Sequence, residues 1–202
     1  MGLKDLKKNF LVESATTLFL SEGIEKVTIK DIATHAGVGE MTIYRYFGKK
    51  QAIVTEAVIK LQEIVSKNYF KLEEGKTGFD KLSIFYNSYL QVFIDRPNYF
   101  QFIREFDLCM SKEDSSSLQR YEDELNIFKH SYIEAYELGL KDGSVKEVED
   151  IELFYFTTTH ALIELCKKLA ISRGVLPQDE KIEKAKEIGC LISTFLKIFK
   201  NS

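Results

Sequence analysis

Residues 28–50 read TIKDIATHAGVGEMTIYRYFGKK, and this stretch decides the fold of the N-terminal part of the chain. Thr28 and Asp31 have the spacing of a capping box, in which the hydroxyl accepts a backbone N–H and the carboxylate reaches back. The short helix that follows is expected to end at Gly37, and a second one is expected to begin at Glu40. Two short helices joined by a glycine-containing turn are typical of a helix-turn-helix unit.

Apolar residues recur at three- and four-residue steps through the rest of the chain, which predicts further helices. Only 2 prolines and 11 glycines occur in 202 residues, so long helices are favoured over many short strands. Pro97 and Pro177 stand where helices can begin, and Gly174 stands where one can end. We therefore expect an all-α fold of about nine helices, over residues 4–21, 28–36, 40–47, 50–72, 79–94, 97–110, 118–140, 150–173 and 178–199.

The composition is that of an ordinary globular protein, with 45% hydrophobic and 29% charged residues. No apolar run approaches the ~20 residues that span a bilayer, and the charged N-terminus lacks the apolar stretch of a signal peptide. The three cysteines, Cys109, Cys166 and Cys190, are odd in number and widely spaced. Reduced thiols and a cytoplasmic location are therefore expected.

Charge is distributed unevenly along the chain. Residues 1–50 hold eight basic and six acidic side chains, whereas the remainder holds 20 basic and 25 acidic ones. The whole protein has a formal net charge of −3, which by itself does not indicate a nucleic-acid binder. A locally basic N-terminal unit nevertheless permits contact with phosphates, because the local surface is what meets DNA.

The histidines and cysteines do not predict an active site. His35, His130 and His160 lack the spacing of metal ligands or of a catalytic triad, and the chain has no glycine-rich phosphate loop and no CxxC. We expect no metal, no cofactor and no enzymatic activity.

The N-terminal 50 residues resemble the DNA-binding domain of the TetR family of bacterial transcriptional regulators. The residues that carry the resemblance are Thr28–Val38, Thr42–Phe47 and Lys50. It implies a three-helix helix-turn-helix DNA-binding domain over residues 1–50 and a larger helical effector-binding and dimerisation domain over residues 51–202. It also implies a homodimer, formed through the last two helices, on a palindromic operator in double-stranded DNA.

The second short helix is the one that the resemblance places in the major groove, where an α-helix fits. Thr42 and Tyr44 resemble the family's groove-facing pair, and Tyr46 resembles its phosphate-contacting position. Lys50 opens the next helix, where a bound phosphate would satisfy both the lysine and free backbone N–H groups. The full set of expected DNA-contacting residues is Thr28, Lys30, Gly39, Glu40, Met41, Thr42, Tyr44, Arg45, Tyr46 and Lys50.

Three of these residues depart from the common family pattern. Gly39 stands where a serine is frequent, so a phosphate-contacting hydroxyl is absent. Glu40 repels phosphate unless it accepts from a cytosine amino group, and Met41 has the reach to contact a thymine methyl group. We interpret the three departures as tuning of the operator sequence.

Twenty of the 25 aromatic residues lie after residue 50, and the resemblance implies a small-molecule effector among the middle helices. An aromatic interior suits a flat or largely apolar ligand. The expected ligand-binding residues are Phe85, Tyr89, Phe93, Phe102, Phe106, Phe128, Tyr132, Tyr136, Phe156 and His160.

These observations favour a ligand-responsive, sequence-specific transcriptional repressor, released from its operator when an aromatic or apolar molecule binds. Two alternatives stay open at the level of sequence. One is a helical small-molecule binding protein with a vestigial helix-turn-helix, supported by the low net basicity and by Glu40. The other is a DNA-binding protein with a packed core and no effector.

Overall fold

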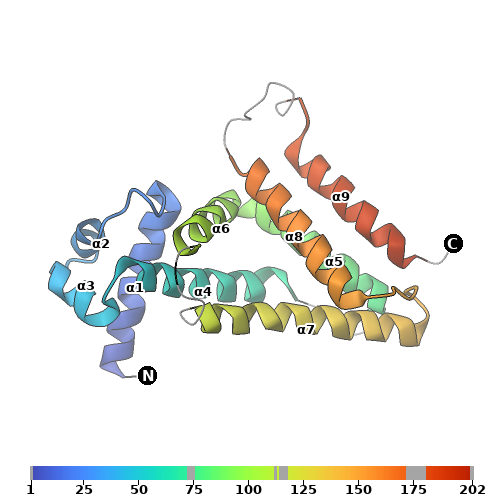
Figure 1. The fold of residues 1–202 in the computed structure, drawn as a ribbon, viewed down its shortest axis with the longest axis horizontal. Coiled ribbons are helices and arrows are strands. Elements are labelled where there is room, and N and C mark those ends of the chain that lie inside the picture. The colour runs from blue at the N-terminus through green and yellow to red at the C-terminus, as the bar shows by residue number, and fades with distance from the viewer. Residues whose placement is uncertain (1, 72–75, 112, 114–117, 172–180, 201–202) are drawn as a thin grey trace. The chain divides into compact units, whose positions relative to one another are not determined.

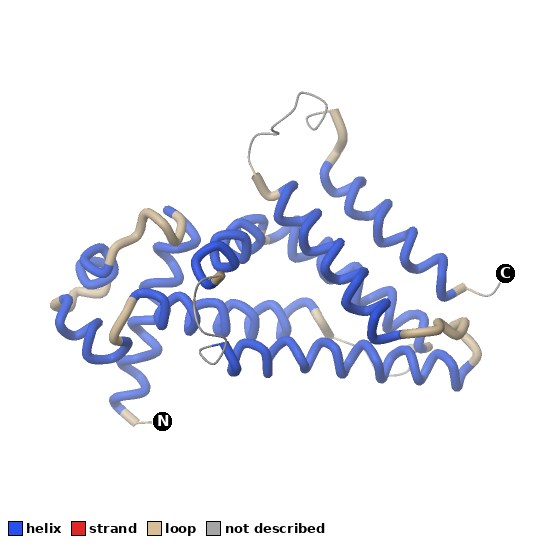
Figure 2. Tube along the Cα trace, in the orientation of Figure 1, coloured by secondary structure: helices blue, strands red, loops and turns tan. Residues whose placement is uncertain are grey.

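The structure, a computed structural model, describes residues 2–71, 76–111, 113, 118–171 and 181–200. Over these residues it contains α-helices and no strand (Figure 2), as the sequence predicts. The helices are α1 (Leu3–Glu22), α2 (Ile29–His35), α3 (Glu40–Phe47), α4 (Lys50–Tyr69), α5 (Gly78–Asp95), α6 (Pro97–Met110), α7 (Gln119–Asp142), α8 (Ile151–Leu169) and α9 (Lys184–Phe199). None of the described helices is both long and apolar enough to cross a lipid bilayer.

The chain divides into two compact units. Unit 1 comprises residues 1–63 and 101–124, and unit 2 comprises residues 64–100 and 125–202. The limits between the units fall inside α4, α6 and α7 rather than in loops. The predicted boundary at residue 50 separates a DNA-binding domain from an effector-binding domain. It is a boundary of function, so it stays a prediction.

Unit 1 is built on the small bundle α1–α3, in which α1 contacts α2 and α2 contacts α3. The apolar residues that the pattern places on the inner faces of α2 and α3 are buried, among them Ile32, Ala33 and Ile43. In α1, apolar residues at helical spacing predict an inner face that includes Leu6 and Phe10. Both are exposed, and burial starts at Leu11.

Unit 2 has α5, α8 and α9 packed against one another (Figure 1). Its α5 and α7 meet at two glycines, because a Cβ atom on Gly78 would lie 2.1 Å from the backbone nitrogen of Gly139. Only a residue without a side chain permits this approach. Asp142 fixes the crossing further by accepting the backbone N–H of Gly78 at 2.8 Å.

Some expected helix ends differ from the observed ones. Helix α4 ends at Tyr69 rather than at residue 72, and α8 ends at Leu169 rather than near residue 173. Helix α9 begins at Lys184 rather than at residue 178, so Ile182, expected on the apolar side of this helix, is exposed and outside it. Pro97 opens α6 as predicted. The roles expected of Gly174 and Pro177 concern residues outside the described ones.

Candidate functional site

The start of α2 is fixed by the predicted capping box. The Thr28 hydroxyl oxygen accepts the backbone N–H of Asp31 at 3.2 Å, and an Asp31 carboxylate oxygen accepts the backbone N–H of Thr28 at 2.8 Å. The hydroxyl also donates to that carboxylate at 2.6 Å. This hydrogen bond from Thr28 lowers the pKa of Asp31 below its usual value of 3.8. The exposed end of α2 therefore keeps a fixed backbone geometry and a negative charge.

The turn between α2 and α3 closes in the way its glycine predicts. Gly37 has a φ of +64°, the backbone N–H of Val38 donates to the carbonyl of Ala33 at 2.9 Å, and the N–H of Gly37 donates to that of Thr34 at 3.2 Å. This pair of bonds is a Schellman motif, which ends α2 and redirects the chain. With Ile43 buried beneath it, α3 has one orientation relative to α2.

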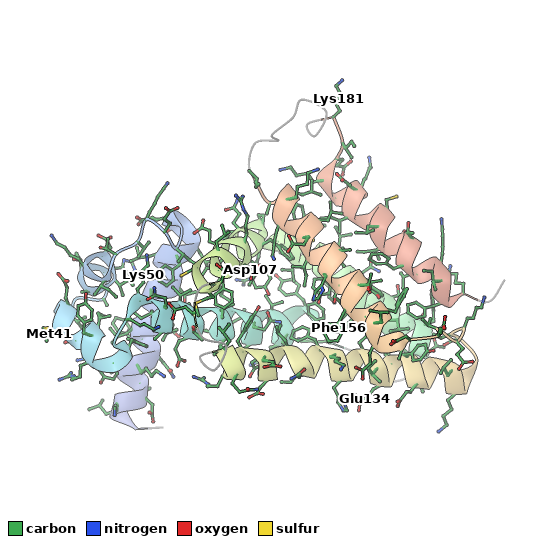
Figure 3. All side chains as sticks on the ribbon, in the orientation of Figure 1. Met41, Lys50, Asp107, Glu134, Phe156 and Lys181 are labelled. Atoms are coloured by element: carbon green, nitrogen blue, oxygen red, sulfur yellow. The ribbon has the colours of Figure 1, made fainter. Side chains whose placement is uncertain are left out.

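Helix α3 turns a continuous face to solvent. Met41, labelled in Figure 3, is 79% exposed. Tyr44 is 45% exposed, and Glu40 and Arg45 are exposed as well. Their spacing of three and four residues puts them on one side of the helix. An exposed methionine and an exposed tyrosine side by side, with nothing in the described chain covering them, form a surface able to meet another molecule.

The remaining α3 candidates are less exposed. Thr42 and Tyr46 are half-buried, and their spacing of four residues puts them on the same edge of this face. The guanidinium of Arg45 lies over the Tyr46 ring, with its central carbon 5.6 Å from the ring centroid. Gly39 caps α3 without a side chain, and a Cβ atom there would meet nothing within 4 Å. We refer to the exposed Glu40, Met41, Tyr44 and Arg45, with the half-buried Thr42 at one edge, as the α3 face.

Lys50 is held inside unit 1 by contacts that its sequence position did not indicate. Its ammonium donates to the backbone carbonyl of Ile24 and, at 3.4 Å, to that of Glu25, both in the loop after α1. On the other side of Ile24, its backbone N–H donates to the carboxylate of Glu105 from α6. Burial lowers the pKa of Lys50, against the effect of nearby Cys109 and Glu105. Lys50 thus has a structural role, and its expected phosphate contact stays a prediction.

The other two expected contacts flank the α3 face. Thr28 and Lys30 are exposed at the start of α2. Lys49, which the sequence analysis did not select, is exposed next to Lys50 and forms an ion pair with Glu113. The structure therefore gathers nine of the ten expected residues at accessible positions on α2, α3 and their connection, with Lys50 committed to the α1–α2 loop.

Unit 2 contains an aromatic cluster that includes four expected ligand-binding residues. Phe85 makes edge-to-face contacts with Tyr89 and Tyr132, at centroid distances of 5.7 and 5.1 Å. Phe70, which the sequence analysis did not select, contacts Phe85, Tyr89 and Phe128. These rings pack on one another, so the interior of this cluster is largely filled rather than open.

The tyrosine hydroxyls of this interior bond to one another. Tyr86 shares hydrogen bonds with the hydroxyl of Tyr132 at 2.9 Å and with that of Thr158 at 2.7 Å, and all three residues are buried. Burial raises the pKa of Tyr86 to about 12, so its phenol is neutral at physiological pH. A tyrosine-rich interior therefore needs no ligand to satisfy these polar groups.

The other expected ligand-binding residues lie away from this cluster. Phe93 packs on Phe100, and Tyr136 packs on Phe199 and accepts the backbone N–H of Val148 at 2.8 Å. Phe102 and Phe106 belong to unit 1, where their rings contact those of Phe19 and Tyr121 respectively.

Two expected interior residues are on the surface of the chain. Phe156 is 42% exposed on α8, and His160, whose ring centroid lies 5.8 Å from that of Phe156, is exposed one turn later. Neither lines an interior cavity in the described chain. The spacing of apolar residues on α8 predicts an apolar helix face. It does not indicate whether that face packs against the same chain or against another one.

A small hollow lies beside the aromatic cluster. It is lined by Ser66 and Phe70 at the end of α4, by Phe85 of α5, and by Ile127, Phe128 and Ser131 of α7. Its free volume is about 20 Å³, space for about one water molecule. Of the residues expected to bind ligand, only Phe85 and Phe128 line this hollow.

Known proteins resemble this chain in sequence and in fold. Residues 11–57, which include α2 and α3, match the sequence model of the bacterial regulatory proteins of the tetR family. The chain is 25% identical over 157 residues to the HTH-type transcriptional repressor KstR2 of Rhodococcus jostii (strain RHA1), in an alignment that covers 75% of this chain and 74% of the relative.

Solved structures share the fold over almost the whole chain. A protein from Saccharomonospora viridis in complex with choline has a TM-score of 0.75 at 18% identity, covering 98% of this chain and 100% of that one. The transcriptional regulator FadR from Bacillus subtilis in complex with stearoyl-CoA has a TM-score of 0.71 at 16% identity, covering 95% and 98%. At these identities the likeness is one of fold.

The described residues hold no group of side chains that could bind a metal ion. His130 with Glu134, and His160 with Glu164, have the four-residue spacing of side-chain pairs on a helix, and the two pairs differ. His130 and Glu134 approach to 3.2 Å on the surface, whereas Glu164 pairs with Lys167 instead of His160. Cys166 is buried, and burial raises the pKa of its thiol to about 12, which leaves it unreactive at neutral pH.

Proposed function

We propose that this protein is a ligand-responsive transcriptional repressor of the tetR family that binds a palindromic operator as a homodimer. The observation that carries the proposal is the α3 face. Its exposed Met41, Tyr44 and Arg45 stand on a helix whose position is set by the Thr28–Asp31 cap and the Gly37 turn. A rigid helix with an exposed polar and aromatic face is what a major groove accepts.

Sequence readout in this proposal belongs to the α3 face. Tyr44 offers an aromatic face and a hydroxyl, Met41 contacts a thymine methyl group, and Glu40 accepts from a cytosine amino group. Thr28, Lys30, Tyr46 and the backbone at Gly39 contact phosphates and set the register on the duplex. Arg45, stacked on Tyr46, is placed for either a phosphate or a base edge.

Dimerisation in this proposal uses the exposed faces of α8 and α9. Leu153 is 63% exposed, Phe156 is 42% exposed and Ile198 is 47% exposed, an unusual amount of apolar surface for two neighbouring helices. A Cβ atom on Gly189 would meet nothing within 4 Å, so α9 offers a shallow place for a second helix to approach. A two-fold dimer also supplies the second reading helix that a palindrome requires.

In this proposal the effector and the operator bind different conformations of the dimer. Effector binding therefore lowers the affinity for the operator. The same fold in the Saccharomonospora viridis protein and in FadR is found with choline and with stearoyl-CoA, respectively. These ligands differ so much in size and charge that they indicate a ligand-binding fold without indicating this chain's ligand. A cytoplasmic location follows from the proposed access to DNA.

Selection of genomic fragments on the purified protein tests the proposal. We expect recovered fragments to share an inverted repeat whose half-sites lie about one helical turn apart or a multiple of it. A chain carrying Tyr44→Ala is the matched control and should recover no common sequence. Fragments without any shared repeat would overturn the proposal and favour the vestigial helix-turn-helix.

A further inference from the structure

The ring of Phe70 is surrounded by three other aromatic rings in unit 2. It is the first residue after α4, and its ring makes edge-to-face contacts with Phe128, Tyr89 and Phe85 at centroid distances of 4.7, 5.0 and 5.4 Å. The Phe70 side chain is only half-buried. One end of this three-sided aromatic site is therefore open to solvent, and a competing ring can reach it.

The hollow next to Phe70 carries no charged side chain in its lining. Its walls are three phenylalanines, one isoleucine and two serines. A charged group placed there would lose part of its hydration without gaining a charged partner. The site selects for an uncharged molecule.

The two serines are the polar groups of this hollow, and they come from different helices. Several other helix hydroxyls bond to the carbonyl four residues earlier, as Thr55 does to Gln51 at 3.0 Å and Ser88 to Ile84 at 2.8 Å. Within the part of the chain that the structure describes, the hydroxyls of Ser66 and Ser131 make no hydrogen bond. Both can donate to or accept from a molecule in the hollow.

We propose that Phe70 occupies the ring site of the effector, and that the effector is an uncharged molecule with one aromatic ring and a hydroxyl or amide group. The effector ring replaces that of Phe70 among Phe85, Tyr89 and Phe128, and its polar group bonds to Ser66 and Ser131. This inference rests on the proposed function, because it names the class of effector to which the repressor responds. Phenols and indoles have this chemistry.

Displacing Phe70 has a consequence for α4. The backbone N–H of Phe70 donates to the carbonyl of Ser66 at 3.2 Å, and the anchored ring holds this last turn in place. The same helix begins at Lys50, which binds the loop after α1. Releasing the ring frees the end of a helix whose beginning supports the helix-turn-helix.

Calorimetric titration of the full chain with phenol tests the ring site without any DNA. We expect phenol to bind Phe70→Ala at least ten-fold more tightly than the unaltered chain, because no side chain then has to leave; apolar cavities made by such truncations bind benzene. Phe70→Leu, which removes less volume, should give an intermediate affinity. Phe79→Ala is the matched control and should bind as the unaltered chain does.

Equal phenol affinity in the Phe70 variants and in Phe79→Ala would overturn the ring site, as would no binding to either Phe70 variant. If the Phe70→Ala chain fails to fold, the phenol affinity of Phe70→Leu still tests the ring site.

The polar part of the inference has its own comparison. In the Phe70→Ala background, Ser66→Ala with Ser131→Ala should weaken phenol binding about ten-fold and leave benzene binding unchanged. Benzoate, which has the same ring with a charge, should bind at least ten-fold more weakly than phenol. An equal loss for benzene, or benzoate binding as tight as phenol binding, would overturn the assignment of the serines and of an uncharged ligand.

Operator titration separates this inference from the proposed function. One outcome is that phenol binds in the calorimeter and yet leaves the affinity for the operator unchanged. That result would overturn the regulatory role of the ring site but not its existence. Loss of all operator binding in the unaltered chain would overturn the proposed function, whatever phenol does.

Discussion

Lys50 and Glu105 hold the two polar backbone groups of the same residue. The ammonium of Lys50 binds the carbonyl of Ile24, and the carboxylate of Glu105 binds its N–H. The loop between α1 and α2 is thereby tied both to α4 and to α6, within unit 1. The position of the helix-turn-helix thus depends on two helices, α4 and α6, that lie outside the α2–turn–α3 unit itself.

Lys50→Met keeps most of the length of the side chain and removes its charge. We expect the free energy of unfolding to fall by about 1–3 kcal/mol, because two carbonyls lose a charged donor. Denaturant unfolding measures this. Lys49→Met is the matched control, since Lys49 forms only an exposed ion pair and should lose less than about 1 kcal/mol. Unchanged stability with a weaker salt dependence of DNA binding would instead place the Lys50 ammonium on a phosphate.

A serine at position 39 should improve both α3 and its contact with DNA. Gly39 has φ −77° and ψ 148°, a conformation that serine adopts freely, and a Cβ atom there meets nothing. We expect Gly39→Ser to add a few tenths of a kcal/mol of stability and to tighten operator binding through the new hydroxyl.

The control for this change is two residues away. Gly37→Ser places a side chain at a φ of +64°, so it should destabilise the chain by about 1 kcal/mol. Thermal unfolding and DNA titration of the two variants, compared side by side, measure the contrast. Equal effects of the two serines would contradict the local geometry of this turn.

The Thr28–Asp31 cap predicts a specific loss of stability in acid. Because the folded chain lowers the pKa of Asp31 below 3.8, the unfolded chain binds a proton there more readily. The contribution of this carboxylate is present in full above the unfolded pKa and is lost as pH falls through the folded one. The difference in melting temperature between Asp31→Asn and the unaltered chain should therefore be smaller at about pH 2 than at about pH 6. A constant difference across that range would contradict the prediction.

Tyr86→Phe tests the polar network in unit 2. Removing its hydroxyl leaves those of Tyr132 and Thr158 without a shared partner in a buried site. The free energy of unfolding should fall by about 1–3 kcal/mol. Tyr121→Phe, whose ring packs on Phe106, is the comparison and should cost less. Equal losses would show that the network adds nothing beyond ring packing.

The sequence predicted the parts of this structure that neighbouring residues determine. The Thr28 cap, the Gly37 turn and the opening of α6 at Pro97 each depend on residues within one helical turn, so spacing alone indicates them. The exposure of Met41 and Tyr44 follows from the same local register once Ile43 is known to be buried.

Contacts between distant segments were not predictable in this way. Lys50 reaches Ile24 and Phe70 reaches Phe128 only through the packing of several helices. Phe156 shows a second limit of sequence-based prediction. Apolar periodicity identifies a helix face that packs against something, but it does not identify the packing partner. Ser66 and Ser131 gave a weak signal, as hydroxyls in helix interiors, but nothing in the sequence places them in one hollow.

Fluorescence anisotropy on the duplex recovered by genomic selection, against a scrambled duplex at two salt concentrations, tests the central claim most directly. We predict preferential binding to the recovered duplex, an affinity that falls steeply with salt, and loss of the preference in Tyr44→Ala with its melting temperature unchanged. Tyr44 is 45% exposed, so its truncation should not disturb the fold. Equal, weak binding to both duplexes, with Tyr44→Ala behaving as the unaltered chain does, would contradict the account.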